Sequence, residues 1–207
     1  MFTGIVQSVA TLEDVQDHQG IRTFVIHFEP GFCDELEIGA SVAVDGVCLT
    51  VTELLSEVRV KFDVMPQSLN ITTLSQYQAG DRVNVERAAK DGAEIGGHPL
   101  SGHVDFNTEV LEVRQVEDNY CIRFALPDSW KRYIFPKGYI AINGASLTIG
   151  EVRGNRFNIH LIPETLRATT FGTCEEGQRV NIEIDSQTQT IVDPLDRLRY
   201  DRPAPTL

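Results

Sequence analysis

An internal repeat constrains this chain more than any other feature. Three blocks of the first half recur in the same order in the second half, at residues 42–51 and 140–149, 62–73 and 159–170, and 80–86 and 177–183. The first block keeps the residue type at every position. The offset is 97 or 98 positions throughout, which is the mark of a duplicated structural unit rather than of chance similarity.

The duplication divides the chain into two units, which suits its length of 207 residues. We expect three parts: an N-terminal domain over residues 1–97, a second domain over 98–190, and a C-terminal helix and tail over 191–207. In the last part, Asp193 is predicted to cap a short amphipathic helix that begins at Pro194. Its apolar side, with Leu195 and Leu198, would cover either the chain's own domains or a neighbouring chain.

Hydrophobic residues in both halves alternate with a period of two. Residues 58–63 and 156–161 show this clearly, which predicts half-buried strands. The Asp45-Gly46 and Asn143-Gly144 dipeptides lie between such runs and favour type I′ hairpin turns. The fold class is therefore all-β, with a small antiparallel barrel or sandwich in each half. We favour the barrel because closure leaves no exposed edge. Short helical turns are expected at residues 69–75 and 166–172.

Composition excludes several classes of function. Lys and Arg number 18 against 30 Asp and Glu, so the formal net charge of -12 repels nucleic acid and anionic lipid. The sequence has no run of about 18 apolar residues and no basic leader at its start, so we expect a cytoplasmic protein. The four cysteines are widely spaced and show no zinc-binding pattern, so neither structural zinc nor disulfides are expected.

Several motifs together resemble riboflavin synthase, the alpha chain of the lumazine-binding repeat family. They are residues 1–6, 46–51, 101–104, 143–148 and 161–166. The resemblance implies two similar six-stranded Greek-key barrels and a C-terminal helix that assembles a homotrimer. It also implies the transferase reaction that ends riboflavin biosynthesis, in which two molecules of 6,7-dimethyl-8-ribityllumazine give riboflavin and 5-amino-6-ribitylamino-uracil. It implies no metal or organic cofactor, and it names lumazine synthase as a candidate partner.

The resemblance also implies two groups of substrate-binding residues, one in each half. The first group is Gly4, Ile5, Val6, Cys48, Leu49, Thr50, Asp63, Val64, Met65, Pro66, Gln67 and Ser68. The second group is Gly102, His103, Val104, Lys137, Ser146, Leu147, Thr148, Ile162, Pro163, Glu164 and Thr165. Without the repeat, each of these residues has an ordinary structural explanation, such as a buried cysteine or a threonine in a strand.

Three of these residues are catalytic candidates. The reaction removes a proton from the 7-methyl group of one lumazine, and His103 suits that task because histidine exchanges protons near neutral pH. The other lumazine is attacked at C7 by a nucleophile. Cys48, Ser146, water and a ribityl hydroxyl all remain open for that role.

The first half departs from the family pattern. Gln67 and Ser68 stand where the second half has Glu164 and Thr165, and neutral acceptors bind hydroxyl groups more weakly than carboxylates do. In the second half, Phe106 follows Val104 and Asp105 at a position where a small residue is common in the family. The rival hypothesis is a non-catalytic antenna protein that binds lumazine or flavin. In such relatives the second half loses its ligand residues, whereas here that half is complete, which favours the enzyme.

Overall fold

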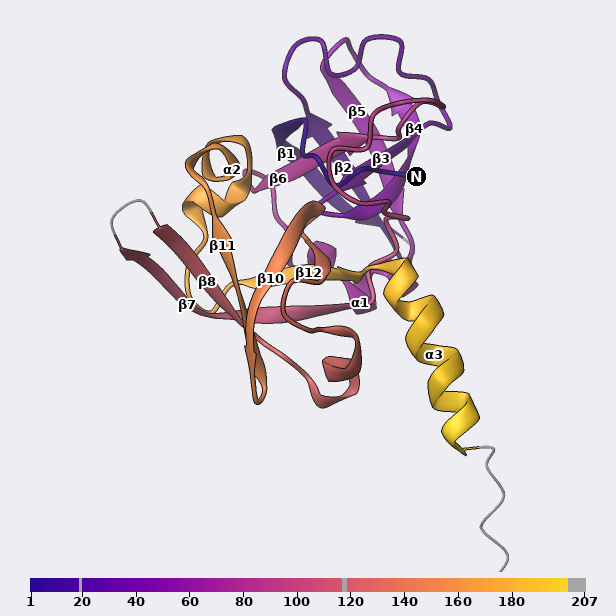
Figure 1. Ribbon diagram of the computed structural model, residues 1–207. Helices are drawn as coiled ribbons and strands as arrows, with labels where there is room; N and C mark the ends of the chain where they lie inside the picture. The colour runs from indigo at the N-terminus through magenta and orange to yellow at the C-terminus, as the bar shows by residue number, and fades with distance from the viewer. Residues whose placement is uncertain (19, 117–118, 201–207) are drawn as a thin grey trace, which may run out of the picture.

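The described residues, 1–18, 20–116 and 119–200 of the computed structural model, form two closed antiparallel barrels (Figure 1). The first barrel consists of β1 (Ser8–His18), β2 (Ile21–His27), β3 (Ser41–Val44), β4 (Val47–Leu54), β5 (Arg59–Val64) and β6 (Arg82–Arg87). The second consists of β7 (Phe106–Val116), β8 (Asn119–Ala125), β9 (Tyr139–Ile142), β10 (Ala145–Arg153), β11 (Arg156–Leu161) and β12 (Arg179–Ile184). The predicted pair of six-stranded barrels is confirmed.

Both barrels close with the same strand order. The first runs β1-β2-β5-β4-β3-β6, and the second has the corresponding order β7-β8-β11-β10-β9-β12. The predicted hairpin turns are confirmed, because Asp45 and Asn143 have φ of 44° and the glycines that follow have φ of 80° and 78°. Bulges interrupt β4 after Val51 and β10 after Ile149, which are repeat counterparts.

Side chains fill the interior of each barrel. In β5, Val60, Phe62 and Val64 are fully buried while the residues between them face outward, as the alternation predicts. Phe106, the departure noted above, lies in the core of the second barrel and stacks on Trp130 at 4.9 Å between ring centroids. Because both lumens are packed with side chains, a ligand must bind on the outside of a barrel.

Short helices follow β5 and β11, as expected. They are α1 (Pro66–Ile71) with the 3₁₀ turn η1 (Thr73–Gln76), and α2 (Pro163–Ala168) with η3 (Thr170–Thr173). A further 3₁₀ turn, η2 (Asp128–Tyr133), follows β8. Both α-helices begin at their proline, whose fixed φ suits the first helical position.

The C-terminal helix starts earlier than expected. Helix α3 spans Ser186–Tyr200, so Asp193 is not its cap and Pro194 lies inside it. Asp185 caps it instead, accepting hydrogen bonds from N and Oγ1 of Thr188 at 3.0 and 2.8 Å. The expectation of a start at Asp193 is wrong because Asp followed by Pro imitates a helix start. In Figure 1 the helix extends away from the barrels.

Two buried asparagines join the barrels. Asn84 of β6 donates from Nδ2 to the carbonyl of Asn143 at 3.0 Å, and its counterpart Asn181 of β12 donates to the carbonyl of Asp45 at 2.9 Å. Each amide oxygen also accepts a backbone N–H from the other barrel at 2.8 Å. The amide nitrogen and oxygen of both side chains thus bond across the boundary, which fixes one barrel relative to the other.

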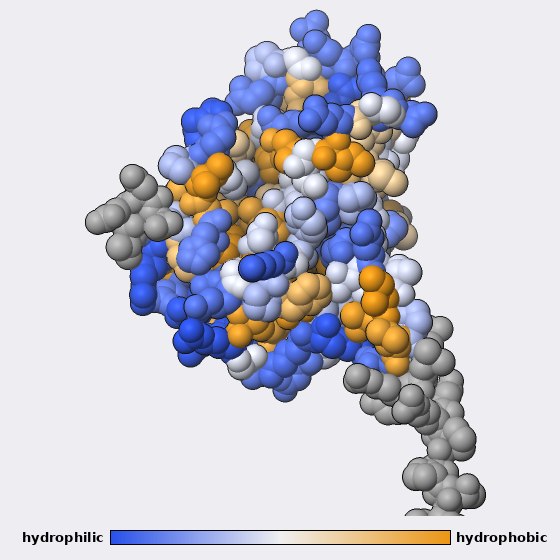
Figure 2. All heavy atoms as spheres, in the orientation of Figure 1, coloured by the Kyte–Doolittle hydropathy of each residue, from blue (hydrophilic) through white to orange (hydrophobic). Residues whose placement is uncertain are grey.

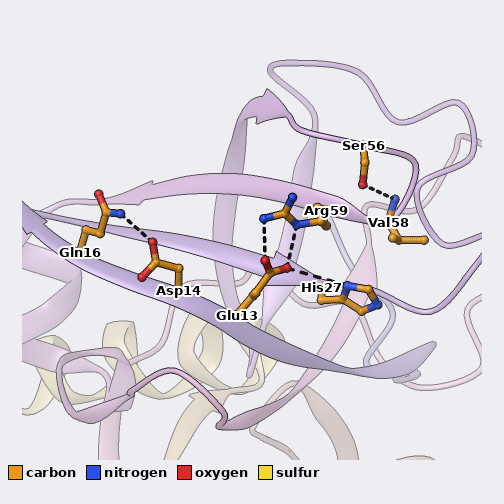
Figure 3. Close-up of polar contacts among 7 residues, drawn as sticks. All are labelled: Glu13, Asp14, Gln16, His27, Ser56, Val58 and Arg59. Atoms are coloured by element: carbon orange, nitrogen blue, oxygen red, sulfur yellow. Dashed lines mark hydrogen bonds and ion pairs between the residues drawn. The ribbon is translucent and has the colours of Figure 1, made fainter.

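Outside the site described below, the surface of the first barrel carries exposed ion pairs. Arg59 of β5 reaches Glu13 of β1 with both Nε and Nη2, at 2.7 and 2.5 Å, and His27 of β2 lies beside the same carboxylate (Figure 3). Such exposed pairs contribute little to stability. No helix among the described residues is long and apolar enough to cross a membrane.

Candidate functional site

Two short segments cross from one barrel to the other. The carbonyl of Gly4 accepts a hydrogen bond from N of Ser146 in β10 at 2.8 Å, and the carbonyl of Gly102 accepts one from N of Cys48 in β4 at 2.9 Å. The segment 2–5 therefore lies against the second barrel, and the segment 100–103 lies against the first. The two segments pair with each other through Phe2 and Leu100.

This exchange corrects one expectation. The resemblance grouped Gly4, Ile5 and Val6 with Cys48, and Gly102, His103 and Val104 with Ser146. The structure places the two segments the other way round, and the side chains agree, since Val6 packs on the core of the second barrel and Val104 on that of the first. The expected grouping is wrong because hydrogen bonds across the barrel boundary, rather than nearness in sequence, position these segments.

Glycine is required at both crossing points. Gly4 and Gly102 have φ of 75° and 78°, a region that other residues rarely adopt. A Cβ atom at Gly102 would lie 2.6 Å from Cβ of Cys48, and one at Gly4 would lie 2.5 Å from Cβ of Ser146. The absence of a side chain therefore allows each segment to approach the strand that carries a catalytic candidate.

A buried carboxylate holds each segment. Glu86 accepts hydrogen bonds from N and Oγ1 of Thr3 at 2.6 and 2.7 Å, and from N of Gly4 at 3.0 Å. Glu183 binds Ser101 in the same way, with both distances 2.7 Å. Burial raises the pKa of both carboxyl groups, while the donated hydrogen bonds act in the opposite direction.

The polar residues of β4 and β10 lie on the outer face of each barrel. Leu49 points into the core, so its neighbours Cys48 and Thr50 point outward, and Ser146 and Thr148 flank Leu147 in the same manner. Cys48 and Ser146 are half-buried, whereas both threonines are exposed. Each half therefore presents a thiol or hydroxyl beside a second hydroxyl on an accessible surface.

The strand-to-helix junctions carry exposed apolar side chains. Met65 and Ile162 are repeat counterparts that precede α1 and α2, and they are 59% and 64% exposed. Val64, in contrast, is buried in the core and offers a ligand only its backbone. The carboxylate of Asp63 is exposed and accepts a hydrogen bond from Oγ1 of Thr23 at 2.6 Å.

The helical residues after these junctions also differ in their exposure. Pro66, Gln67, Pro163 and Glu164 are exposed, whereas Ser68 and Thr165 are half-buried. Together with Met65 and Ile162, they give each half a surface that is partly apolar and partly polar, which suits a flat heterocycle that carries a hydroxylated chain.

His98 is a second histidine at this location, and it was not among the predicted site residues. Its Nδ1 lies 2.6 Å from Oγ of Ser146, and its ring stacks on Tyr139 with 5.1 Å between centroids. Burial lowers the pKa of His98, and the charge of Asp185 acts in the opposite direction. His103, in contrast, is exposed and follows Gly102 in the segment beside Cys48.

Comparison with known proteins identifies the family. The sequence profile of the lumazine binding domain matches residues 3–88 and 101–185. The riboflavin synthase of Escherichia coli (strain K12) is 50% identical over 199 residues, which cover 96% of this chain and 93% of that protein. The chain belongs to the riboflavin synthase family. The relative from Chlamydia pneumoniae is 43% identical over 96% of each chain.

Solved structures of a ligand-binding protein share the fold of this chain. The crystal structure of LumP complexed with 6,7-dimethyl-8-(1'-D-ribityl) lumazine has a TM-score of 0.81 and 27% sequence identity, and it covers 89% of this chain and 99% of LumP. The LumP complex with riboflavin has a TM-score of 0.82 and 29% identity. Both identities are well below the 50% shared with the E. coli enzyme.

Sequence reasoning missed two kinds of residue in this member of the riboflavin synthase family. Glu86 and Glu183 are counterparts in the third repeated block, so the repeat itself carried a signal for them. His98 lies between the repeated blocks, and its burial reveals it. Within the described part of the chain, no group of three or more His, Cys, Asp or Glu is placed to hold a metal ion.

Proposed function

We propose that this chain catalyses the dismutation of two molecules of 6,7-dimethyl-8-ribityllumazine into riboflavin and 5-amino-6-ribitylamino-uracil. One lumazine gives a four-carbon unit to the other, so the atoms of two substrates equal those of two products. The observation that carries the proposal is the 50% identity to a riboflavin synthase over nearly the whole chain. The presence of a hydroxyl or thiol and a crossing segment in both halves supports it.

Two matched sites suit a reaction between two copies of one molecule. Each site would bind one lumazine, with Met65 or Ile162 against the ring and Thr50 or Thr148 beside the ribityl chain. Holding two reactants in a productive geometry replaces a collision by an intramolecular step, which contributes about 7–11 kcal/mol in favourable cases. We therefore assign most of the catalysis to orientation.

We further propose that the two lumazines meet between neighbouring chains of a homotrimer. Both sites lie on outer, accessible barrel faces, which leaves room for a second chain to cover them. Helix α3 supports this, because Ile191 and Leu195 are 62% and 55% exposed. Figure 2 shows hydrophobic surface gathered over the middle of this helix, where it extends beyond the barrels. If this hydrophobic surface is buried between neighbouring chains, it would stabilise the trimer.

The assay for this function follows riboflavin formation from 6,7-dimethyl-8-ribityllumazine by absorbance, with purified protein. Steady formation of riboflavin with release of the uracil in equal amounts supports the enzyme. Tight binding of lumazine without turnover would overturn it and would support a binding protein of the LumP kind. Sedimentation of the same sample tests the trimer separately.

We propose that His103 removes the proton from the 7-methyl group. We expect His103→Gln to lower kcat about 100-fold while KM changes little, since general base catalysis contributes about 10² to 10⁴. His27→Gln is the matched control, because His27 is exposed at the end of β2, beside Glu13 on the outer surface of the first barrel (Figure 3). Equal losses in kcat and in lumazine affinity would remove the catalytic role from His103.

A further inference from the structure

The two sites differ at one position that the repeat otherwise aligns. Tyr139 is the first residue of β9 and pairs with Thr148 of β10, and its counterpart Ser41 pairs with Thr50. Residues that pair directly across an antiparallel ladder point to the same face of the sheet. The second site therefore has an aromatic ring beside Thr148 where the first site has a small hydroxyl.

The Tyr139 ring is exposed on one side and covers a buried histidine on the other. It is 54% exposed, while His98 behind it is 3% exposed. The two rings are stacked, with centroids 5.1 Å apart and planes inclined by 21°. This contact, together with the hydrogen bond from N of His98 to the carbonyl of Thr3 at 3.1 Å, orients the imidazole so that Nδ1 reaches Oγ of Ser146 at 2.6 Å.

The loop that presents Tyr139 adopts an unfavourable conformation. Lys137 has φ of 70°, whereas its counterpart in the first half is a glycine, Gly39, with φ of 90°. A residue other than glycine in this region costs about 1 kcal/mol. The backbone N–H of Gly39 donates to the carbonyl of Val51, and that of Lys137 donates to the carbonyl of Ile149, both at 2.8 Å. The two loops therefore have the same shape. The second half nevertheless keeps a long cationic side chain where glycine would cause less strain. Such strain is found at functional sites more often than elsewhere.

We propose that Tyr139 is a positioning residue of the second site, where it holds His98 against Ser146 and keeps water from the imidazole, so that the two sites of the chain are chemically unequal. The proposal rests on the proposed function for its kinetic consequence. Its structural part, the orientation and shielding of His98, stands without it. The Nε2 atom of His98 is itself buried, which shows how completely Tyr139 and its neighbours enclose the imidazole.

Tyr139→Ser is the central test, because serine is the residue that the first half has at this position. We expect kcat to fall about tenfold with a smaller change in KM, and the acid limb of the kcat profile to move to higher pH. The reason is that water admitted to His98 relieves the burial that lowers its pKa. Asp185 is the charged group that acts on His98 in both proteins. Tyr139→Phe keeps the stacked ring and should retain the wild-type profile.

NMR titration of the His98 ring nitrogens separates this proposal from the proposed function, because it needs no turnover. The His98 midpoint should rise in Tyr139→Ser and remain unchanged in Tyr139→Phe. It should also remain unchanged in Ser41→Ala, a control at the corresponding position of the first half. An unchanged midpoint in Tyr139→Ser, or an equal rise in Tyr139→Phe, would overturn the positioning role even if riboflavin is formed. If the midpoints are as expected but the protein forms no riboflavin, the positioning role of Tyr139 stands and the proposed reaction is refuted.

Discussion

The two barrels are copies in fold, but they differ in one buried polar pair at their boundary. Strand order, hairpin turns and bulges all correspond, yet the first barrel places Asp45 and Tyr77 where the second has Asn143 and Cys174. The hydroxyl of Tyr77 donates to Asp45 at 2.5 Å, and N of Asn84 donates to the same carboxylate at 2.8 Å. The duplicated fold thus keeps its strand order and most of its boundary contacts, while the pair at Asp45 and Tyr77 has diverged.

The largest effect is expected from a substitution at the contact between the two barrels. Gly46 and Gly144 face each other there, and a Cβ atom at Gly46 would lie 2.8 Å from N and 3.1 Å from Cα of Gly144. We expect Gly46→Ala to lower the free energy of unfolding by about 2–4 kcal/mol, because backbone strain and overpacking add. Urea denaturation measures this loss.

Gly177→Ala is the matched control for that loss. Gly177 also has a positive φ, 83°, but a Cβ atom there would meet nothing within 4 Å. This variant should lose only the strain, about 1 kcal/mol. If both variants lost the same amount, close contact between the barrels would not be what stabilises the pair.

The buried carboxylate is the second difference to test. Burial raises the pKa of Asp45 to about 7, although the hydrogen bonds that Tyr77 and Asn84 donate to its carboxylate act to lower the pKa. Because the folded pKa lies above the ordinary value of 3.8, the folded state binds the proton more tightly. The contribution of Asp45 to stability is therefore full below about pH 4 and is lost as the pH rises through about 7.

We expect the wild type to lose about 3 kcal/mol more than Asp45→Asn between pH 5 and pH 8. The substitution gives the first barrel the residue of the second, which cannot ionise. Urea denaturation of both proteins at the two pH values measures the difference. Tyr77→Phe removes a donor to the carboxylate and should move the decline to higher pH. Parallel pH dependences in the wild type and Asp45→Asn would show that Asp45 keeps one protonation state throughout.

Local features of the fold could be predicted from the sequence, whereas contacts between the barrels could not. Alternation in β5 and the Asp45-Gly46 turn depend on neighbouring residues, so a single sequence reveals them. The start of α3 differs from the prediction because two aspartates that can cap a helix, Asp185 and Asp193, lie eight residues apart, and the helix begins after the first. The repeat identified the outward-facing residues of β4 and β10, since matched positions in two copies share one environment.

The arrangement of the candidate site lay beyond sequence reasoning for a similar reason. The crossing of segments 2–5 and 100–103 depends on how two folded barrels dock, and no periodicity within either segment reports it. His98 is hidden by the same cause, because its burial arises from Tyr139 and from the segment that carries Thr3. Pattern analysis therefore finds residues whose environment is set by their own strand, and it misses those whose role depends on segments that are distant in the sequence.

The smallest expected effect concerns the first turn of the short helices α1 and α2. In α2, Glu164 pairs with Arg167, and both side chains are exposed, whereas the first half has Gln67 and Asn70 at these positions. Gln67→Glu gives the first site a carboxylate with no arginine beside it, free to accept a hydrogen bond from a ribityl hydroxyl. A charge-assisted bond exceeds a neutral one by about 1 kcal/mol, so we expect lumazine to bind the first site about fivefold more tightly.

Fluorescence titration with lumazine measures this change, and the double variant Gln67→Glu, Asn70→Arg is its control. In the double variant the new carboxylate has the arginine partner that Glu164 has, so part of the gain should be lost. A gain of equal size in both variants would show that added charge near the site, rather than a free acceptor, strengthens binding. No gain in either would place the ribityl chain away from Gln67, and the two halves would then bind their ligands through different parts of the same junction.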